Sequence, residues 1–331
     1  MSSSGRRDDS RPTPALAAIV CTFNRSGLLR GMLESLTTQT LSASAFEVVV
    51  VDDGSSDDTP QVVDAFKDRL PLQSVRQRHA GLASAKNHGL FRTRSPLVLF
   101  LDDDDVADSG LLEQHVIAHR RYQAASDAVL GYTGLSAELR DDPLMDFVTE
   151  VGRFQFSYPG LHAGDALDYA YFWGGRTSCK RSFLLTHGVF NQVFRFGCED
   201  IELGYRLSMH GLTVRYHPAA KSTMVRSMTV DQFCERLARQ GQSNAIFSRL
   251  HADPAVQRWT EVAEAIQLWE KASPAYDAIR RSAHLLDAAY RRKREAGLEA
   301  HDEDLRYLHR AYWMACTISK AKGTMEGLAQ A

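Results

Sequence analysis

The feature that most constrains this chain is a series of short apolar runs that alternate with helix-like stretches between residues 15 and 125. The runs LAAIVC, FEVVVV and PLVLFL lack the polar alternation of a half-exposed strand, so each predicts a strand that is covered on both faces. Helices are expected over about 26–39, 57–69, 82–92 and 110–122, with a further strand over 72–76. This order is typical of βαβ units and predicts an α/β fold with a Rossmann-like, mostly parallel sheet flanked by helices.

The rest of the 331-residue chain divides into three further parts. Residues 1–14 are polar and are expected to be disordered. Residues 126–228 are irregular and rich in aromatic residues, but they include one amphipathic helix over 199–210 and a short strand, TVRYH, over 213–217. Residues 229–331 have helical periodicity, which predicts a C-terminal helical appendage that packs on the rest of the protein and is a candidate surface for a homo-oligomer.

Net charge and cysteine spacing narrow the functional classes. A net charge of −2 argues against nucleic-acid binding, which needs a basic surface. No apolar run approaches the roughly 18 residues of a membrane span, and the first residues lack the apolar centre of a secretory signal. The five cysteines are scattered without a CxxC pair, so neither a disulfide framework nor a zinc site is expected. We therefore expect a cytoplasmic protein without an integral membrane segment.

Two acidic clusters follow directly on predicted strands. Asp52 and Asp53 come after FEVVVV, and the four aspartates of residues 102–105 come after PLVLFL. The carboxyl ends of parallel strands line the ligand crevice of an open sheet, so the two clusters are expected to meet in one cleft. Carboxylate oxygens favour Mg²⁺ or Mn²⁺, and such ions commonly bridge carboxylates and phosphates, which indicates a ligand with a diphosphate. Neither a P-loop nor a G-x-G-x-x-G motif follows the first strand, so ATPase and dinucleotide-dehydrogenase functions lose support.

Five motifs then occur in a fixed order: AAIVCTFNRSGLLRGMLESL, EVVVVDDGSSDDT, HAGLASAKNHGL, LVLFLDDDD and FGCEDIELGYRL. Together they resemble the family-2 inverting glycosyltransferases with a GT-A fold, over about residues 15–245. The resemblance implies a nucleotide-sugar-binding half over residues 15–125 and an acceptor-binding half over residues 126–228. It also implies a nucleoside-diphospho-sugar donor, with UDP as the expected nucleotide.

The resemblance assigns donor-binding roles residue by residue. The residues implied to contact the nucleotide or its sugar are Thr22, Phe23, Arg25, Asp53, Gly81, Lys86, Asp102, Asp104, Gly175 and Arg176. Asp53 matches the family aspartate that accepts a hydrogen bond from the base N3–H, which suits uracil. Asp102 and Asp104 resemble the D-x-D pair, so that Asp104 lies near the ribose and either Asp104 or Asp105 binds the metal. Arg176 stands where the family has Asn, and Lys86 where it often has Arg.

The Glu199–Asp200 pair resembles the family's Glu-Asp motif, whose second acid is the general base. An acid in the first turn of a helix is also expected to be held ionised by the unpaired N–H groups and the helix dipole. Such a carboxylate can accept the proton of an acceptor hydroxyl as that oxygen attacks the anomeric carbon. The alternative is that Glu199 and Asp200 are ordinary helix-start acids.

The third metal ligand and two surface features stay open. His217 is a candidate ligand, and the alternative is a structural histidine, with the metal resting on Asp105, the diphosphate and water. Six basic residues over 280–294 form a run that is either a solvated helix face or a contact with an anionic carrier or membrane surface. Aromatic residues over 154–173 stack either on sugars or in the core.

The sequence therefore predicts a metal-dependent (Mn²⁺ or Mg²⁺), inverting glycosyltransferase that moves a sugar from a UDP-sugar to an acceptor hydroxyl. Two alternatives come from other classes. One is a catalytically silent nucleotide-sugar-binding partner of another transferase. The other is a sugar-1-phosphate nucleotidyltransferase, for which CTFNRSG is a poor phosphate loop.

Overall fold

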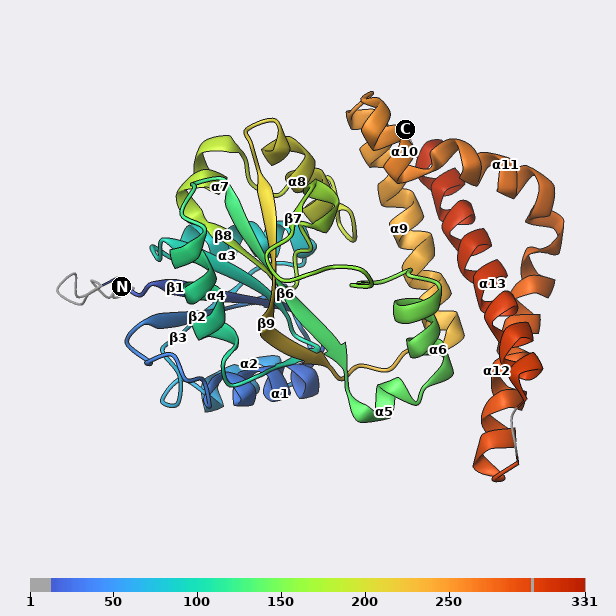
Figure 1. Ribbon diagram of the computed structural model, residues 1–331, viewed down its shortest axis with the longest axis horizontal. Helices are drawn as coiled ribbons and strands as arrows, with labels where there is room; N and C mark the ends of the chain where they lie inside the picture. Colours follow the sequence, from blue (N-terminus) through green and yellow to red (C-terminus); the bar gives the residue numbers. More distant parts are fainter. Residues whose placement is uncertain (1–12, 299–300, 331) are drawn as a thin grey trace.

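The computed structural model describes residues 13–298 and 301–330. In this described part, nine strands form one mixed sheet in the order β3-β2-β1-β4-β8-β6-β9-β5, with β7 paired to β9 (Figure 1). The strands are β1 (Leu16–Thr22), β2 (Phe46–Asp52), β3 (Leu72–Arg76), β4 (Leu97–Asp102), β5 (Asp105–Ala107), β6 (Asp127–Leu135), β7 (Ala166–Leu167), β8 (Thr177–Lys180) and β9 (Thr213–Met224). The predicted α/β fold is confirmed, whereas the expected disorder of residues 1–14 lies almost entirely outside the described residues.

The helices of the sheet-containing body cover both faces of the sheet. They are α1 (Ser26–Leu36), α2 (Thr59–Ala65), α3 (Leu82–Arg92), α4 (Leu111–Arg121), α5 (Ala137–Arg140), α6 (Pro143–Asp146), α7 (Arg181–His187) and α8 (Glu199–Ser208), with a π-helical turn (Phe147–Val151) and a 3-10 turn (Tyr169–Tyr171). One apolar cluster joins α1, α2 and α4 to one face of β1 and β2. A second cluster joins α3, α7 and α8 to the other face. This two-sided burial explains the unbroken apolar runs in the sequence.

The parallel pairing of β1, β2 and β4 fixes where the acids lie. Thr22 pairs in register with Asp52, and Cys21 pairs with Asp102. The three strands therefore end at one edge of the sheet, and the two acidic clusters meet there as expected. The expected short strand over 213–217 is only the first part of β9, which continues to Met224. Its polar second half escaped notice because it alternates between buried and exposed positions while it pairs with β6 and β5.

The C-terminal region is helical, as expected, and lies beside the body as a separate layer (Figure 1). Its helices are α9 (Val230–Leu250), α10 (Pro254–Thr260), α11 (Val262–Ala272), α12 (Tyr276–Glu295) and α13 (Asp302–Ala329), with a 3-10 turn (Ser273–Ala275). Helices α9 and α13 approach so closely that a Cβ on Gly323 would lie 1.7 Å from the Ala238 carbonyl oxygen. Phe233, Leu237 and Tyr312 are buried in the shared core of these helices and the α6 segment.

The basic run of α12 is largely committed to contacts within the chain. Arg291 forms ion pairs with Asp142 and Asp287, and Arg294 donates to the Asp141 carbonyl oxygen. Arg280 and Lys293 also pair with acids, namely Asp231 and Asp304. Arg291 and Arg294 thus hold α12 to the body, whereas the pairs of Arg280 and Lys293 lie within the helical region. Across residues 13–298 and 301–330, no helix combines the length and apolar character needed to cross a bilayer.

Candidate active site

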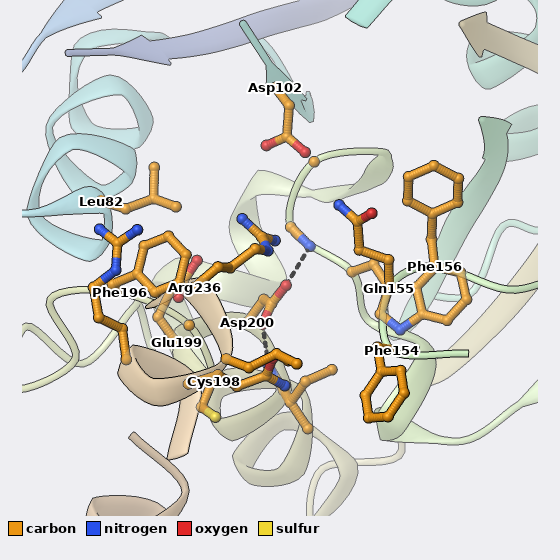
Figure 2. Close-up of a pocket in the computed structure, with 18 of the residues that line it drawn as sticks. Leu82, Asp102, Phe154, Gln155, Phe156, Phe196, Cys198, Glu199, Asp200 and Arg236 are labelled. Carbon is orange, nitrogen blue, oxygen red and sulfur yellow. Dashed lines mark hydrogen bonds between the residues drawn. The ribbon is translucent and has the colours of Figure 1, made fainter. Parts of the chain in front are cut away.

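A cavity of about 1210 Å³ lies at the sheet edge where β1, β2 and β4 end. Its walls come from the ends of these strands, the start of α3, the segment 152–156, the segment 173–176, the start of α8, and helices α9, α11 and α13. The carboxylates of Asp102 and Asp200 both face this cavity, although they come from segments about 100 residues apart (Figure 2). The acids of both halves of the body thus share one site.

An aromatic pair and Asp53 form one end of the cavity. The rings of Phe23 and His79 stack with their centroids 4.2 Å apart, and both residues line the cavity. The Asp53 carboxylate accepts from the backbone N–H groups of Ala80 and Gly81 at 2.9 Å and from Gln77 Nε2 at 2.7 Å. His79 Nδ1 lies 2.9 Å from Asp53 Oδ2 and 3.2 Å from the Asp53 carbonyl oxygen, which is its hydrogen-bond partner. A carboxylate has about four lone-pair sites, so one remains for a further donor such as a base N–H. Asp53 therefore first of all holds the loop over residues 77–81.

The loop over residues 77–81 ends at Gly81, which immediately precedes α3 and has a φ of +95°. A Cβ at this position would lie 3.0 Å from the Arg195 carbonyl oxygen, so the glycine allows the start of α3 to approach the loop before α8. This close approach sets the position of Lys86, one turn further along α3.

The four aspartates of residues 102–105 point in different directions. Asp103 is buried and accepts from Thr22 Oγ1 at 2.7 Å and Arg25 Nη1 at 2.8 Å. Asp102, at the end of β4, is the more exposed acid, and its Oδ2 lies 3.2 Å from Arg176 Nη2. Thr22 and Arg25, both predicted to contact the donor, thus position the turn.

Asp104 and Asp105 behave differently from one another. The Oδ2 of Asp104 lies 3.5 Å from both Arg25 Nη1 and Arg226 Nη1 at the cavity. Asp105 is buried behind the turn, where its Oδ2 accepts from Ser222 at 2.8 Å, and it does not line the cavity. Burial is also the main cause that raises the pKa of Asp105 to about 7. Of the two alternatives for the metal-binding acid, the structure brings only Asp104 into the cavity.

The Gly174–Gly175–Arg176 segment packs directly on acids. A Cβ on Gly175 would lie 1.9 Å from Asp102 Oδ2, so only glycine fits the present position of that carboxylate. Arg176 is buried, stacks on Phe156 at 4.3 Å and faces Asp102. Phe154, Phe156 and Trp173 line the cavity, whereas Phe172 is fully buried in the core, so the aromatic stretch is divided between the two.

Glu199 and Asp200 begin α8 after two residues with positive φ, Gly197 (+74°) and Cys198 (+62°). A left-handed Cys is a strained position, and strain of this kind concentrates at functional sites. Glu199 is buried and its Oε1 forms an ion pair of 2.9 Å with Lys86 Nζ. Burial opposes the charge on Lys86, but Glu199 and neighbouring acids outweigh it and raise the pKa of Lys86. Glu199 thus anchors α8 to α3.

The Asp200 carboxylate is held by two backbone donors, since Oδ2 accepts from Gly174 N–H and Oδ1 from Ile201 N–H, both at 2.8 Å. Burial, followed by the charge of Glu199, raises the pKa of Asp200 to about 6, although Lys86 and the two N–H groups oppose the rise. The N–H groups at the helix start thus favour the ionised acid, as expected, but desolvation outweighs them. The acid still ionises at neutral pH, and its raised pKa makes it a better base.

His217 does not reach this site. Its Nε2 lies 3.0 Å from Gln114 Oε1 beside α4, and the residue does not line the cavity. It is seven residues before Met224, which pairs with Asp105, so the extended strand separates it from the acids. We therefore leave His217 out of the proposed metal site.

The remaining acids fit a divalent ion that is shared with a ligand. Asp102 and Asp104 line the cavity, and the arginine contacts of each are made by Oδ2, so Oδ1 has no arginine partner. Within residues 13–298 and 301–330 there is no group of three His, Cys, Asp or Glu side chains that could hold a metal. Two hard oxygen donors completed by phosphate and water suit Mg²⁺ or Mn²⁺.

Several cavity residues escaped the sequence analysis because they come from the helical region. They are Arg236, Arg239, Trp259, Trp313 and Lys320, among others, and Arg226 joins them from the segment between β9 and α9. The helical periodicity showed which positions are apolar, but not which face of α9 or α13 turns toward the acids. All five cysteines are free, and burial raises the pKa of Cys21, which lines the cavity, to about 12.

A sheet that gathers acids from successive strand ends around one cavity, opposite a carboxylate at a helix start, defines the GT-A class of fold. The sequence model of the family described as glycosyl transferase family 2 matches residues 17–175, and this part of the chain is a domain of that family. The resemblance noted in the sequence is thereby confirmed.

Similar proteins support the same assignment. Validoxylamine A glucosyltransferase of Streptomyces hygroscopicus subsp. jinggangensis is 34% identical over 222 residues, which cover 60% of this chain and 52% of that protein. The chain thus spans about half the length of this curated relative. Among solved structures, the mannosyltransferase PcManGT from Pyrobaculum calidifontis, in complex with GDP-Man and Mn²⁺, has a TM-score of 0.57 and 20% identity, covering 95% of this chain and 88% of that one. TarS 1-349 of S. aureus in complex with UDP-GlcNAc has a TM-score of 0.52 and 15% identity, covering 94% and 91%.

Proposed function

We propose that this protein is a metal-dependent, inverting glycosyltransferase that moves a sugar from a UDP-sugar to a hydroxyl group of an acceptor. The observation that carries the proposal is the position of Asp200, an acid with a pKa near 6, in the same cavity as Asp102 and Asp104. An acid poised to accept a proton, opposite acids that suit a metal and a diphosphate, is what a single displacement at an anomeric carbon needs.

The donor is proposed to lie along the strand ends. The stacked Phe23 and His79 rings would flank the nucleobase, and Asp53 would hold the adjoining loop and accept from the base with its remaining lone pair. The TarS complex with UDP-GlcNAc favours a uridine nucleotide, and the relative named validoxylamine A glucosyltransferase favours glucose. UDP-glucose is therefore the first donor to test. Gly175 and Arg176 would contact its sugar.

Asp104, together with Asp102, would hold the metal beside the diphosphate. When bound, a divalent ion supplies Lewis-acid stabilisation of the charge on the departing diphosphate. The chain's own residues do the rest. Asp200 accepts the proton of the attacking hydroxyl, and the N–H groups of Gly174 and Ile201 fix the direction of its two oxygens. Lys86 holds Glu199, and so keeps the start of α8 in place.

The acceptor is proposed to enter between the body and the helical region. Phe154, Trp173, Trp259 and Trp313 line this part of the cavity, and aromatic rings suit the apolar faces of a sugar or other ring-shaped polyol. A hydroxyl group of such a compound would reach Asp200 from this side.

The experiment is a panel of nucleotides and nucleotide sugars, tested for binding by thermal shift with and without Mn²⁺, followed by release of UDP from UDP-glucose. We expect UDP and UDP-glucose to raise the melting temperature more than GDP or ADP does, because a bound ligand stabilises the folded state. Slow release of UDP from UDP-glucose without an acceptor would follow from attack by water. Absence of both binding and turnover across the panel would contradict the proposal.

A further inference from the structure

Arg236 is a cation in the cavity with no role in the scheme so far. It lies on α9, outside the residues that match the family model, and its guanidinium projects toward Asp200 (Figure 2). The side chain is half-buried and stacks on Phe196 at 5.2 Å, while Arg239 stacks on the same ring at 4.4 Å. Within the described residues, no hydrogen bond or ion pair engages the Arg236 guanidinium.

Two other arginines, Arg25 and Arg226, line the same cavity, and the nearby acids do not neutralise all of this positive charge. Arg25 is matched by Asp103 at 2.8 Å, whereas Arg226, just after β9, has only the 3.5 Å contact with Asp104. Burial lowers the pKa of Arg236. The charges of Asp104 and Asp102 raise it, and those of Arg226 and Arg25 lower it further. Cations that repel one another in a partly desolvated cavity are costly unless an anion joins them. The arrangement is therefore suited to an anionic ligand.

The position of Arg236 is fixed before any ligand arrives. Phe233 and Leu237, its neighbours on α9, are fully buried against α13, and Phe196 supports the guanidinium plane. A planar guanidinium offers paired N–H donors that match two phosphate oxygens, which a point charge cannot do. Because α9 holds the Arg236 guanidinium in the same cavity as Asp104, the guanidinium can bind a phosphate there without a rearrangement of the helix.

We propose that Arg236 and Arg226 form a subsite for the diphosphate of the donor, so that the helical region contributes directly to donor binding. This inference rests on the proposed function, because it takes the anion to be a nucleoside diphosphate. It goes beyond that function because two arginines that follow the family-2 domain would neutralise part of the negative charge on the leaving diphosphate. Binding of UDP should then persist, although weakened, when divalent ions are removed.

The test is calorimetric titration of UDP, UMP and uridine into the full chain, in Mn²⁺ and in EDTA. The variants are Arg236→Gln and Arg236→Lys, and the matched control is Arg249→Gln, an exposed position on the same helix away from the cavity. We expect Arg236→Gln to weaken UDP about tenfold or more, UMP less and uridine hardly at all. Arg236→Lys should fall in between, because it keeps the charge and loses the fork. The control should match the wild type.

Each other outcome overturns the inference in a recognisable way. If UDP binds the wild type and Arg236→Gln equally well, the donor diphosphate does not use Arg236, and an anionic acceptor becomes the alternative to test. If Arg236→Gln weakens uridine as much as UDP, the residue acts through the fold. If the wild type binds none of the three nucleotides even with Mn²⁺, the proposed function fails together with this inference.

Discussion

Replacing Asp200 by Asn tests the proposed base and its electrostatic cost in one protein. The carboxylate is buried next to Glu199, and it accepts N–H bonds from Gly174 and Ile201 at 2.8 Å. Asn has nearly the same shape and can still accept one of these two bonds, but it cannot take up a proton from a hydroxyl. Turnover should therefore fall by about 10²–10⁴-fold, the usual contribution of a general base.

The same substitution should make the protein more stable at pH 8. The pKa of Asp200 is raised from 3.8 to about 6, so holding this acid ionised costs the fold about 3 kcal/mol. Asn avoids this cost but loses one hydrogen bond, which offsets about 1 kcal/mol of the gain in stability. The wild-type protein is free of the cost only while Asp200 is protonated. Its stability is therefore full below about pH 3.8 and falls as pH rises through about 6, where the folded-state acid ionises. The Asn variant should therefore gain about 1–2 kcal/mol at pH 8, and the gain should disappear toward pH 4.

The assay is urea unfolding at pH 4.5 and pH 8, together with UDP release from UDP-glucose. Asp68→Asn, at an exposed acid between α2 and β3 and away from the cavity, serves as the control and should change neither readout. Near-normal turnover of the Asp200→Asn variant would refute the base. A variant that is less stable than the wild type at pH 8, or whose difference does not depend on pH, would refute the electrostatic argument.

The remaining predictions concern the same cavity. Turnover should rise with pH with a midpoint near 6 as Asp200 ionises, measured as initial rates from pH 5 to 9. Lys86→Met should lower the free energy of unfolding by about 3–5 kcal/mol, measured in urea, because it leaves Glu199 buried without its cation. Gly175→Ala should weaken UDP-glucose binding about tenfold or more in calorimetry, because its Cβ would displace the Asp102 carboxylate. Removal of divalent ions by EDTA should reduce turnover by about 10² or more while circular dichroism stays unchanged.

Each of these has a contradicting outcome. A pH profile that is flat between 5 and 7 would exclude Asp200 as the titrating base. Unchanged stability of Lys86→Met would mean that its ion pair with Glu199 contributes nothing. Wild-type affinity in Gly175→Ala would show that Asp102 can move without loss of donor binding, and full activity in EDTA would exclude the metal.

The regular half of the fold could be predicted because its signals are local. The strand Leu72–Arg76 and the helix Leu82–Arg92 coincide with the expected ranges, and the apolar strands β2 and β4 end where their acids begin. The length of strand β9 was predicted too short because its second half alternates between buried and more exposed positions and has few apolar residues. Periodicity alone cannot detect such a strand until its partners are known.

The site could be predicted only to the level of which segments meet. Four consecutive aspartates give no clue to which side chain turns inward, and only the hydrogen bonds to Thr22 and Ser222 separate buried Asp103 and Asp105 from Asp102 and Asp104. The raised pKa of Asp200 likewise depends on burial, which its place in a helix start does not reveal.

The contribution of the helical region was invisible for a different reason. Arg236 is one basic residue among many in a helical stretch, and its place at the cavity follows from how α9 packs on α13. Packing between distant helices is a tertiary property, so a single sequence does not carry it.

The most direct test of the central claim is the configuration of the sugar at the moment of transfer. Proton NMR can follow UDP-α-glucose incubated with the protein and Mn²⁺ and report the anomer that appears first, before mutarotation. One displacement with Asp200 as the base predicts that the β anomer appears first, and that Asp200→Asn releases almost none. Glucose that appears first as the α anomer would contradict the single displacement on which the account rests.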